Sequence, residues 1–299
     1  MIDFHYARLE EKEEIDSILK EASQMGCEYS FTNLYAWVEN YDTEIAVEDG
    51  SLFVEYADGV YLLPAGGDLR AAVLKLRQLA DEHGYSFIIV CMSRENADLL
   101  EQTFPGEYDI RADRDGSDYI YDIEKMSTLA GRKLSKKRNH IHHFEERYPD
   151  WTFEPLNAEN MAECYEMDDK WYQHELDLGS TPSLKGDNTA LRRCMAKYDE
   201  LGLDGGLLRV EGQVVAFTIG SLLPQGEVFC THFEKAFASV DGAYPMINRE
   251  FCKYIHEKYP AVKYVNREDD LGLEGLRQAK SSYYPEILLE KFSAVPKNR

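Results

Sequence analysis

Long hydrophobic runs and paired cysteines are both missing from this sequence of 299 residues. No stretch approaches the roughly 18 to 20 apolar residues that a membrane-spanning helix requires. The first residues also lack the basic and apolar regions of a signal peptide. The six cysteines are widely separated and form no Cys-x-x-Cys pair, which argues against a zinc ribbon and a dithiol redox site. We therefore expect a soluble cytoplasmic protein with reduced cysteines in its core.

Positive charge is scarce as well. The chain has 33 lysine and arginine residues against 55 aspartate and glutamate residues, which gives a net charge of −22. Such a surface repels phosphate backbones and anionic lipids, so contact with these partners requires a local concentration of basic residues. One segment provides it, because residues 125–148 carry a net charge of +5 and their densest part is Gly131 to Arg138.

Two halves of the sequence show the same order of expected elements. In the first half, turn signals and apolar patterns predict three strands, a helix and a buried strand at residues 44–47, 52–56, 60–63, 69–80 and 87–91. The second half repeats this order at residues 207–210, 214–219, 228–233, 244–257 and 262–265. Each half also opens with an expected strand and helix, which lie within residues 4–25 and 152–175.

An antiparallel meander followed by a helix and another strand resembles the order found in Gcn5-related acyltransferases. The resemblance implies an α/β (α+β) protein of two tandem acyl-CoA N-acyltransferase-like domains, each a mixed, mostly antiparallel sheet flanked by helices. We expect the domains to cover residues 1–124 and 151–299, with a basic connecting helix at residues 125–150. A fold does not establish a reaction, so function must be argued from the site residues.

The basic segment reads as one amphipathic helix. Arg132 and Lys136 lie on its polar face, whereas Lys137 lies toward its apolar face. One interpretation is an anion site for phosphate in a cofactor, a tRNA or a lipid headgroup. The other is a solvated helix face that pairs with nearby acidic residues. The candidate phosphate-binding residues are Arg132, Lys133, Lys136, Lys137 and Arg138.

A run of polar residues follows the last strand of the second half, where open α/β sheets usually bind ligands. Glu268 or Asp270 could act as a general base toward an amine or a hydroxyl. Asp270 could instead cap a helix expected at residues 273–280, since an aspartate suits that position. The candidate substrate-binding residues are Asn266, Arg267, Arg277, Lys280 and Tyr283.

Other polar groups are weaker candidates. The histidines at positions 140, 142 and 143 lack the i, i+4 spacing of helical metal pairs, and we expect no metal site. Cys230 and His232 share a strand face as a nucleophile and base might be arranged, but two core side chains are the simpler interpretation. Walker, Rossmann and Gly-x-Ser-x-Gly signatures are absent.

Five motifs, spread over nearly the whole chain, carry a further resemblance: Ser30–Trp37, Gly131–His140, Val265–Gly272, Gly275–Ser281 and Tyr283–Pro285. They look like motifs of a bacterial family of uncharacterised proteins related to the C-terminal catalytic domain of phosphatidylglycerol lysyltransferases. The resemblance extends to Fem-type peptidyltransferases, which take an amino acid from aminoacyl-tRNA. It implies that Arg132, Lys136 and Arg138 face phosphates. It also implies that Asn266, Glu268, Arg277 and Lys280 surround the transfer site.

Two features depart from these families. The lysyltransferases carry an extended membrane region ahead of their catalytic part, and no such region is seen here, which disfavours a lipid acceptor. Acetyl-CoA enzymes usually hold pyrophosphate with a glycine-rich turn before the main helix, whereas the equivalent residues 239–245 contain one glycine.

The sequence therefore predicts an acyl- or aminoacyltransferase. The donor is aminoacyl-tRNA or acyl-CoA, and the acceptor is an amine or hydroxyl of a small molecule, a peptide or a lipid headgroup. In this interpretation the basic helix contacts the tRNA. The alternative is a non-catalytic module that keeps the tandem fold and binds an anion or RNA.

Overall fold

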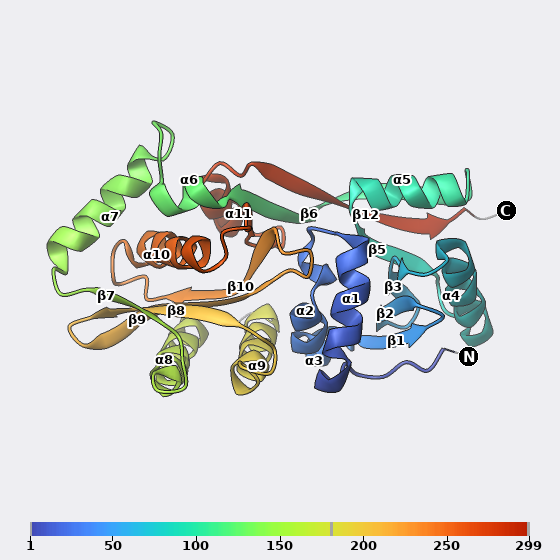
Figure 1. The fold of residues 1–299 in the computed structure, drawn as a ribbon, viewed down its shortest axis with the longest axis horizontal. Helices are drawn as coiled ribbons and strands as arrows, with labels where there is room; N and C mark the ends of the chain where they lie inside the picture. Colours follow the sequence, from blue (N-terminus) through green and yellow to red (C-terminus); the bar gives the residue numbers. More distant parts are fainter. Residues whose placement is uncertain (1, 180–181, 298–299) are drawn as a thin grey trace.

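The computed structural model describes residues 2–179 and 182–297. Within these residues the strands join into one 12-stranded, mostly antiparallel sheet with helices on both faces (Figure 1). The order along the sheet is β1-β2-β3-β5-β12-β6-β11-β10-β9-β8-β7, and β4 pairs with β2. The expected class, a mixed α/β fold with flanking helices, is confirmed.

The repeated order of elements is present in both halves. The first half contains β1 (Glu44–Glu48), β2 (Ser51–Ala57), β3 (Val60–Leu62), β4 (Ala65–Gly66), α4 (Leu69–His83) and β5 (Ile88–Met92). The second half contains β8 (Asp204–Val210), β9 (Gln213–Leu222), β10 (Val228–Ala236), α10 (Ala243–Lys258) and β11 (Tyr264–Asn266). In each half the helix connects two parallel strands, β3 with β5 and β10 with β11.

The two halves form one continuous sheet and are not separated as tandem domains. β6 (Tyr108–Asp122) pairs with β11 at one end and with β12 (Ile287–Pro296) along its length. β12 also pairs with β5, so the end of the chain returns to the first half, as Figure 1 shows for the red strand. Because β12 lies between two strands of the first half, that half is incomplete without residues from the second.

Helices cover both faces of this sheet. One hydrophobic cluster lies beneath both halves and includes residues of α1 (Lys12–Ala22), α2 (Phe31–Ala36), α8 (Met161–Gly179) and α9 (Pro182–Ala196). On the other face, α4 and α5 (Arg94–Thr103) cover the first half, and α10 covers the second. Short elements complete the chain: η1 (Leu9–Glu11), η2 (Cys27–Tyr29), α3 (Val38–Tyr41), β7 (Thr152–Pro155) and α11 (Glu274–Ser281).

The expected strand at the start of the chain is replaced by an isolated bridge between His5 and Ile45, after which the backbone turns into η1. The expected single basic helix is also wrong, because it is divided into α6 (Ile123–Thr128) and α7 (Ser135–Arg147). The helix breaks where Leu129 and Gly131 take left-handed conformations with φ of 50° and 92°. Arg132 and Lys133 therefore lie in a turn, which we call the basic turn (residues 129–134).

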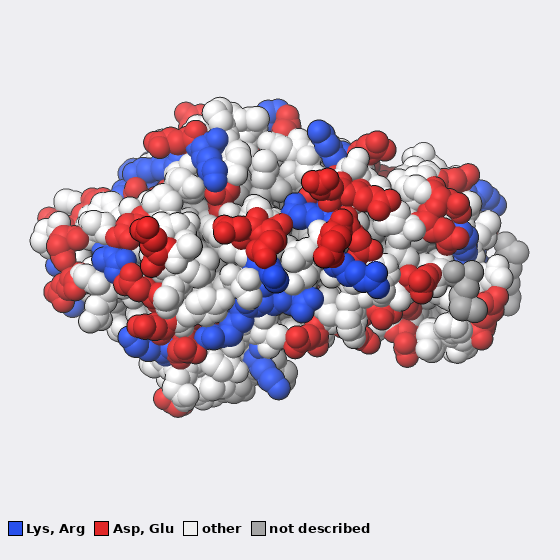
Figure 2. Space-filling model, turned by 60° about the horizontal axis from the view of Figure 1, so that its bottom comes forward, with Lys and Arg blue, Asp and Glu red and all other residues white. Residues whose placement is uncertain are grey.

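Surface charge follows the composition. In Figure 2 acidic side chains are spread across the face shown, with basic side chains lying among them. Several basic side chains adjoin one another in the lower middle of this view, and acidic side chains border them. Binding of a polyanion therefore depends on a local group of cations.

A buried lysine lies where the two halves meet. Lys291 on β12 is 2% exposed, donates to Glu28 Oε2 at 2.5 Å and lies 3.3 Å from Asp118 Oδ2. Burial by itself lowers the pKa of Lys291, but the charges of Asp118 and Glu28 outweigh it and raise that pKa well above its usual value. Burial raises the pKa of Glu28, against the opposing charge of Lys291.

We expect Lys291→Met to lower the free energy of unfolding by roughly 3–5 kcal/mol, because it leaves two carboxylates buried without their counter-charge. Urea unfolding followed by circular dichroism measures this change. Lys75→Met is the control, since Lys75 pairs with Glu48 and Asp49 on the surface, and it should leave stability nearly unchanged. If the two substitutions lower the free energy of unfolding equally, the buried ion pairs of Lys291 contribute no more to stability than the surface pairs of Lys75.

Candidate functional site

The site lies where the parallel strands β10 and β11 separate. They pair only between residues 228–230 and 264–266. β10 then continues to Ala236, whereas β11 ends at Asn266. Beyond that point side chains bridge the two segments, as Arg267 Nη2 donates to Glu234 Oε1 at 2.8 Å and His232 Nδ1 lies 2.9 Å from Glu268 Oε1.

Glu268 belongs to a hydrogen-bonded group of three residues. Its carboxylate contacts His232, and the other ring nitrogen of His232, Nε2, lies 2.8 Å from Ser221 Oγ on β9. The side chain of His232 is 2% exposed, whereas that of Glu268 is 19% exposed. Cys230 Sγ also lies 3.7 Å from Glu268 Oε1. Glu268 is thus the member of the group that solvent reaches most readily.

The backbone of Glu268 is held in a left-handed conformation with φ of 58°. Its N–H donates to Asn266 Oδ1 at 2.7 Å, and its carbonyl oxygen accepts from the Tyr119 N–H at 3.1 Å. Asn266 is fully buried and also donates to Met25 O and Asp118 Oδ2. Asn266 therefore positions Glu268 through the backbone, which differs from the direct substrate contact expected from the sequence.

Asp270 is fully buried and does not cap a helix, because α11 begins at Glu274 with Leu273 at the cap position. Its carboxylate accepts two hydrogen bonds from Arg277, at 2.9 and 2.8 Å, and one from the Tyr119 hydroxyl at 2.6 Å. The hydrogen bond from Arg277 is the main reason that the pKa of Asp270 falls well below its usual range. Such a carboxylate is a weak base. The Arg277 guanidinium binds Asp270 and not a substrate in this arrangement.

Three further residues expected at the substrate are also engaged inside the protein. The ammonium of Lys280 donates to the carbonyl oxygens of Arg267 and Asp269, and burial lowers its pKa. The Arg267 guanidinium lies 5.2 Å from the ring centre of Tyr283, which is itself buried. These contacts hold the loop that carries Glu268.

Asp269 is a titratable group that sequence reasoning missed. Burial, followed by the charge of Glu268, raises the pKa of Asp269 to about 7. In the sequence it is one of three consecutive acidic residues, and nothing in the sequence distinguishes it from its neighbours. Its titration near neutral pH makes the charge of this loop depend on pH.

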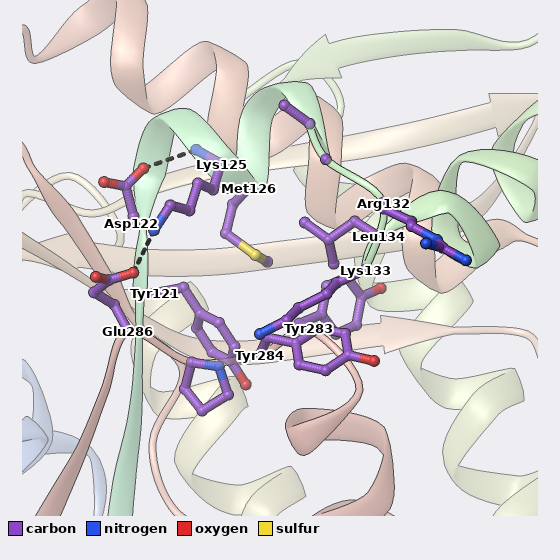
Figure 3. Close-up of a pocket in the computed structure, with 13 residues that line it drawn as sticks. Tyr121, Asp122, Lys125, Met126, Arg132, Lys133, Leu134, Tyr283, Tyr284 and Glu286 are labelled. Carbon is purple, nitrogen blue, oxygen red and sulfur yellow. Dashed lines mark hydrogen bonds and ion pairs between the residues drawn. The ribbon is translucent and has the colours of Figure 1, made fainter.

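The basic turn lines a pocket of about 370 Å³ together with the segment around Tyr283 and Tyr284 (Figure 3). The Lys133 ammonium lies 5.2 Å from the ring centre of Tyr284, and that of Lys137 lies 3.9 Å from the ring of Tyr283. In Figure 3 Lys133 extends over Tyr284, whereas Arg132 points away from it. The pocket thus combines an aromatic surface with cationic groups.

None of the five candidate phosphate-binding residues has an ion-pair partner among the described residues, and four of them make no side-chain hydrogen bond there either: Arg132, Lys133, Lys136 and Lys137. Burial lowers the pKa of Lys137 to about 8, and the charge of Arg267 acts in the same direction. Arg138 differs from them, because its guanidinium donates to the carbonyl oxygens of Leu129 and Gly131 and so closes the basic turn.

Two further places bear on cofactor binding, the turn before α10 and the group around Cys230. The turn before α10 contains Gly242, with φ of 84°, and a Cβ there would lie 2.8 Å from the His140 carbonyl oxygen of α7. The single glycine is therefore required for packing against α7. Cys230, His232 and Glu268 have ligand atoms within 4.8 Å of one another, which is close enough for the three to share a metal ion.

An antiparallel meander followed by a crossover helix and a parallel strand is the arrangement of the acyltransferase-like fold class, and this arrangement alone does not establish a reaction. The sequence then identifies the family. Residues 20–295 match the family described as phosphatidylglycerol lysyltransferase, C-terminal, and the chain belongs to it. The resemblance stated from the motifs is confirmed.

Solved structures agree with this assignment. A conserved protein of unknown function from Bacteroides thetaiotaomicron VPI-5482 is 37% identical, with a TM-score of 0.91 over 99% of this chain and 100% of that one. L-PGS from Bacillus licheniformis is 17% identical, with a TM-score of 0.66 over 96% and 92% of the two chains. A GNAT-family acetyltransferase from Colwellia psychrerythraea is 8% identical, with a TM-score of 0.55 over 100% of both chains. The last two likenesses establish the fold alone.

A curated relative, an uncharacterized protein of Mycoplasmoides gallisepticum, is 26% identical over 192 residues. The match covers 62% of this chain and 58% of the relative. Among the described residues, no helix has the length and apolar character needed to cross a bilayer.

We expect Asp270→Asn to lower the free energy of unfolding at pH 7 by roughly 2 kcal/mol, because it removes the charge that Arg277 and Tyr119 bind. A carboxyl whose pKa is lowered by folding stabilises the protein above its unfolded pKa of about 3.9 and loses this contribution as pH falls. The difference between variant and wild type should therefore shrink below about pH 4. Urea titrations from pH 7 to pH 3.5 measure it.

Glu274→Gln is the matched control, since Glu274 is exposed and accepts only from Gln278. It should change stability little at any pH. If Asp270→Asn lowers the free energy of unfolding by the same amount at every pH, the stabilisation does not come from the ionised carboxylate of Asp270.

Proposed function

We propose that this protein is an acyl- or aminoacyltransferase whose reaction takes place where β10 and β11 separate. The observation that carries the proposal is Glu268, a partly exposed carboxylate held by the hydrogen bond from His232 at this separation. An acceptor amine or hydroxyl attacks the donor carbonyl while Glu268 takes its proton. The bond to the donor oxygen or sulfur then breaks, and that atom leaves with a proton.

Glu268 is a better base than Asp270, because Arg277 and Tyr119 stabilise the ionised form of Asp270. In this proposal Asp270 and Arg277 position the loop. Asn266, Arg267 and Lys280 do the same through the contacts described above. Tyr283 lies between the loop and α7, since it contacts both Arg267 and Lys137.

The donor is an aminoacyl-tRNA in our proposal. Arg132, Lys133 and Lys136 are exposed cations without ion-pair partners among the described residues, and they are available to tRNA phosphates. The ring of Tyr284, which is 51% exposed, offers a surface on which a base can stack. The close contact of Gly242 with α7 disfavours acyl-CoA, because it crowds the turn that would hold a pyrophosphate.

We expect Arg132→Ala and Lys136→Ala each to weaken binding of aminoacyl-tRNA and to reduce the slope of log affinity against log salt by about 1. Filter binding at several salt concentrations measures both quantities. Arg147→Ala is the matched control, because Arg147 is an exposed cation at the opposite end of α7 and should have a smaller effect. Saturable acyl-CoA binding with no tRNA binding would contradict the proposed donor.

We expect Glu268→Gln to lower single-turnover transfer from charged tRNA by about 100-fold or more, because the amide cannot accept the acceptor proton. Its unfolding midpoint should stay near that of the wild type, and Glu274→Gln should transfer normally. Full activity of Glu268→Gln would contradict the assignment of the base. Binding without turnover of either donor by the wild-type protein would instead support a non-catalytic module.

A further inference from the structure

We propose that Ser221 and His232 form a buried hydrogen-bonded relay behind Glu268 that orients its carboxylate toward the acceptor. The inference rests on the proposed function and deepens it. His232 is a positioning residue in this proposal, because it acts on the acceptor only through Glu268. Ser221 in turn positions His232.

The direction of the hydrogen bonds follows from the chemistry of the three groups. An ionised carboxylate only accepts, so the contact of 2.9 Å to Glu268 Oε1 requires a proton on His232 Nδ1. In a neutral imidazole the other nitrogen, Nε2, is then an acceptor. The Ser221 hydroxyl, 2.8 Å away, donates to it. The hydrogen bonds thus run from Ser221 through His232 to Glu268.

The exposed fractions of the three side chains show which end of the relay faces the substrate. Serine, histidine and a carboxylate in this order also form nucleophilic triads, in which the serine meets the substrate. Here Ser221 is 5% exposed and the His232 side chain 2%, whereas the Glu268 side chain is 19% exposed. The carboxylate is therefore the outer group, and the serine supports it from behind.

The sheet holds the relay rigidly. Ser221 lies on β9, His232 on β10 and Glu268 directly after β11, so three adjacent strands supply the three groups. A register shift between Thr231 and Phe233 interrupts the regular alternation of β10 at His232. Such irregularities commonly redirect a side chain next to a functional site.

The hydrogen bond leaves one carboxylate oxygen for the acceptor. Both His232 and Cys230 contact Oε1, and no hydrogen bond to Oε2 is made by the described residues. Oε2 is therefore the oxygen that we assign to the acceptor proton.

Charged and titratable groups surround Glu268. Asp269 follows it in the chain and interacts with it. Lys280 of α11 is the nearby cation, and Cys230 and Tyr41 also interact with Glu268. The hydrogen bond to His232 fixes the orientation of the Glu268 carboxylate among these groups.

The activity test compares two substitutions of His232. Asparagine places an amide N–H near the position of Nδ1 and keeps the donor to Glu268, whereas leucine removes it. We expect His232→Leu to lower kcat by at least about 10-fold and to leave the donor KM unchanged. His232→Asn should restore most of the rate, and the kcat of Ser221→Ala should lie between those of the wild type and His232→Leu. Equal kcat values for His232→Asn and His232→Leu would overturn the proposal.

A second measurement does not depend on turnover. In protein labelled with ¹⁵N-histidine, His232 should show the tautomer protonated at Nδ1 at neutral pH, with its resonance identified from its absence in His232→Asn. Ser221→Ala should shift the Nε2 resonance, and Glu268→Gln should shift the Nδ1 resonance.

The tautomer protonated at Nε2 overturns the relay even if transfer is active. A metal ion bound stoichiometrically and lost in Cys230→Ser also overturns it, because His232 and Glu268 would then be ligands. If His232 is protonated at Nδ1 but the protein transfers from neither aminoacyl-tRNA nor acyl-CoA, the relay stands and only the proposed function is contradicted.

Discussion

The buried charge network around Lys291 supports both the fold and the site. Lys291 joins β12 to Glu28 of η2 and to Asp118 of β6. Asp118 in turn accepts from Asn266, whose side-chain oxygen holds the backbone N–H of Glu268. Because each of these polar groups is removed from water, each needs the next as a partner. The position of Glu268 is thus tied to the junction of the two halves.

The separation of β10 and β11 creates a second constraint. Two parallel strands that part leave backbone groups without ladder partners, and these groups must be satisfied in another way. Asn266, Tyr119 and Lys280 do this for the segment after β11. Most of the polar residues in this segment are therefore used to build the site. The proposed base is Glu268, because Asp270 is bound by Arg277.

Several features of the protein are predictable from its sequence. The alternation of short strands, turn residues and amphipathic helices identified the repeated order of both halves, because these patterns depend on near neighbours in the chain. The concentration of basic residues in an acidic chain also stands out without a structure. The motifs around Gly131 and Val265 identified the family before the match over residues 20–295 confirmed it.

The tertiary structure alone decided how the halves join and what the polar residues do. β6 carries many acidic residues and β12 crosses to the first half, so neither pairing has a local signal. Asp269 and Asp270 are neighbours in the sequence, yet burial raises the pKa of one and Arg277 lowers that of the other. The pairing of Ser221, His232 and Glu268 joins residues from three strands. Such contacts depend on burial and on partners distant in the chain, which patterns of neighbouring residues do not record.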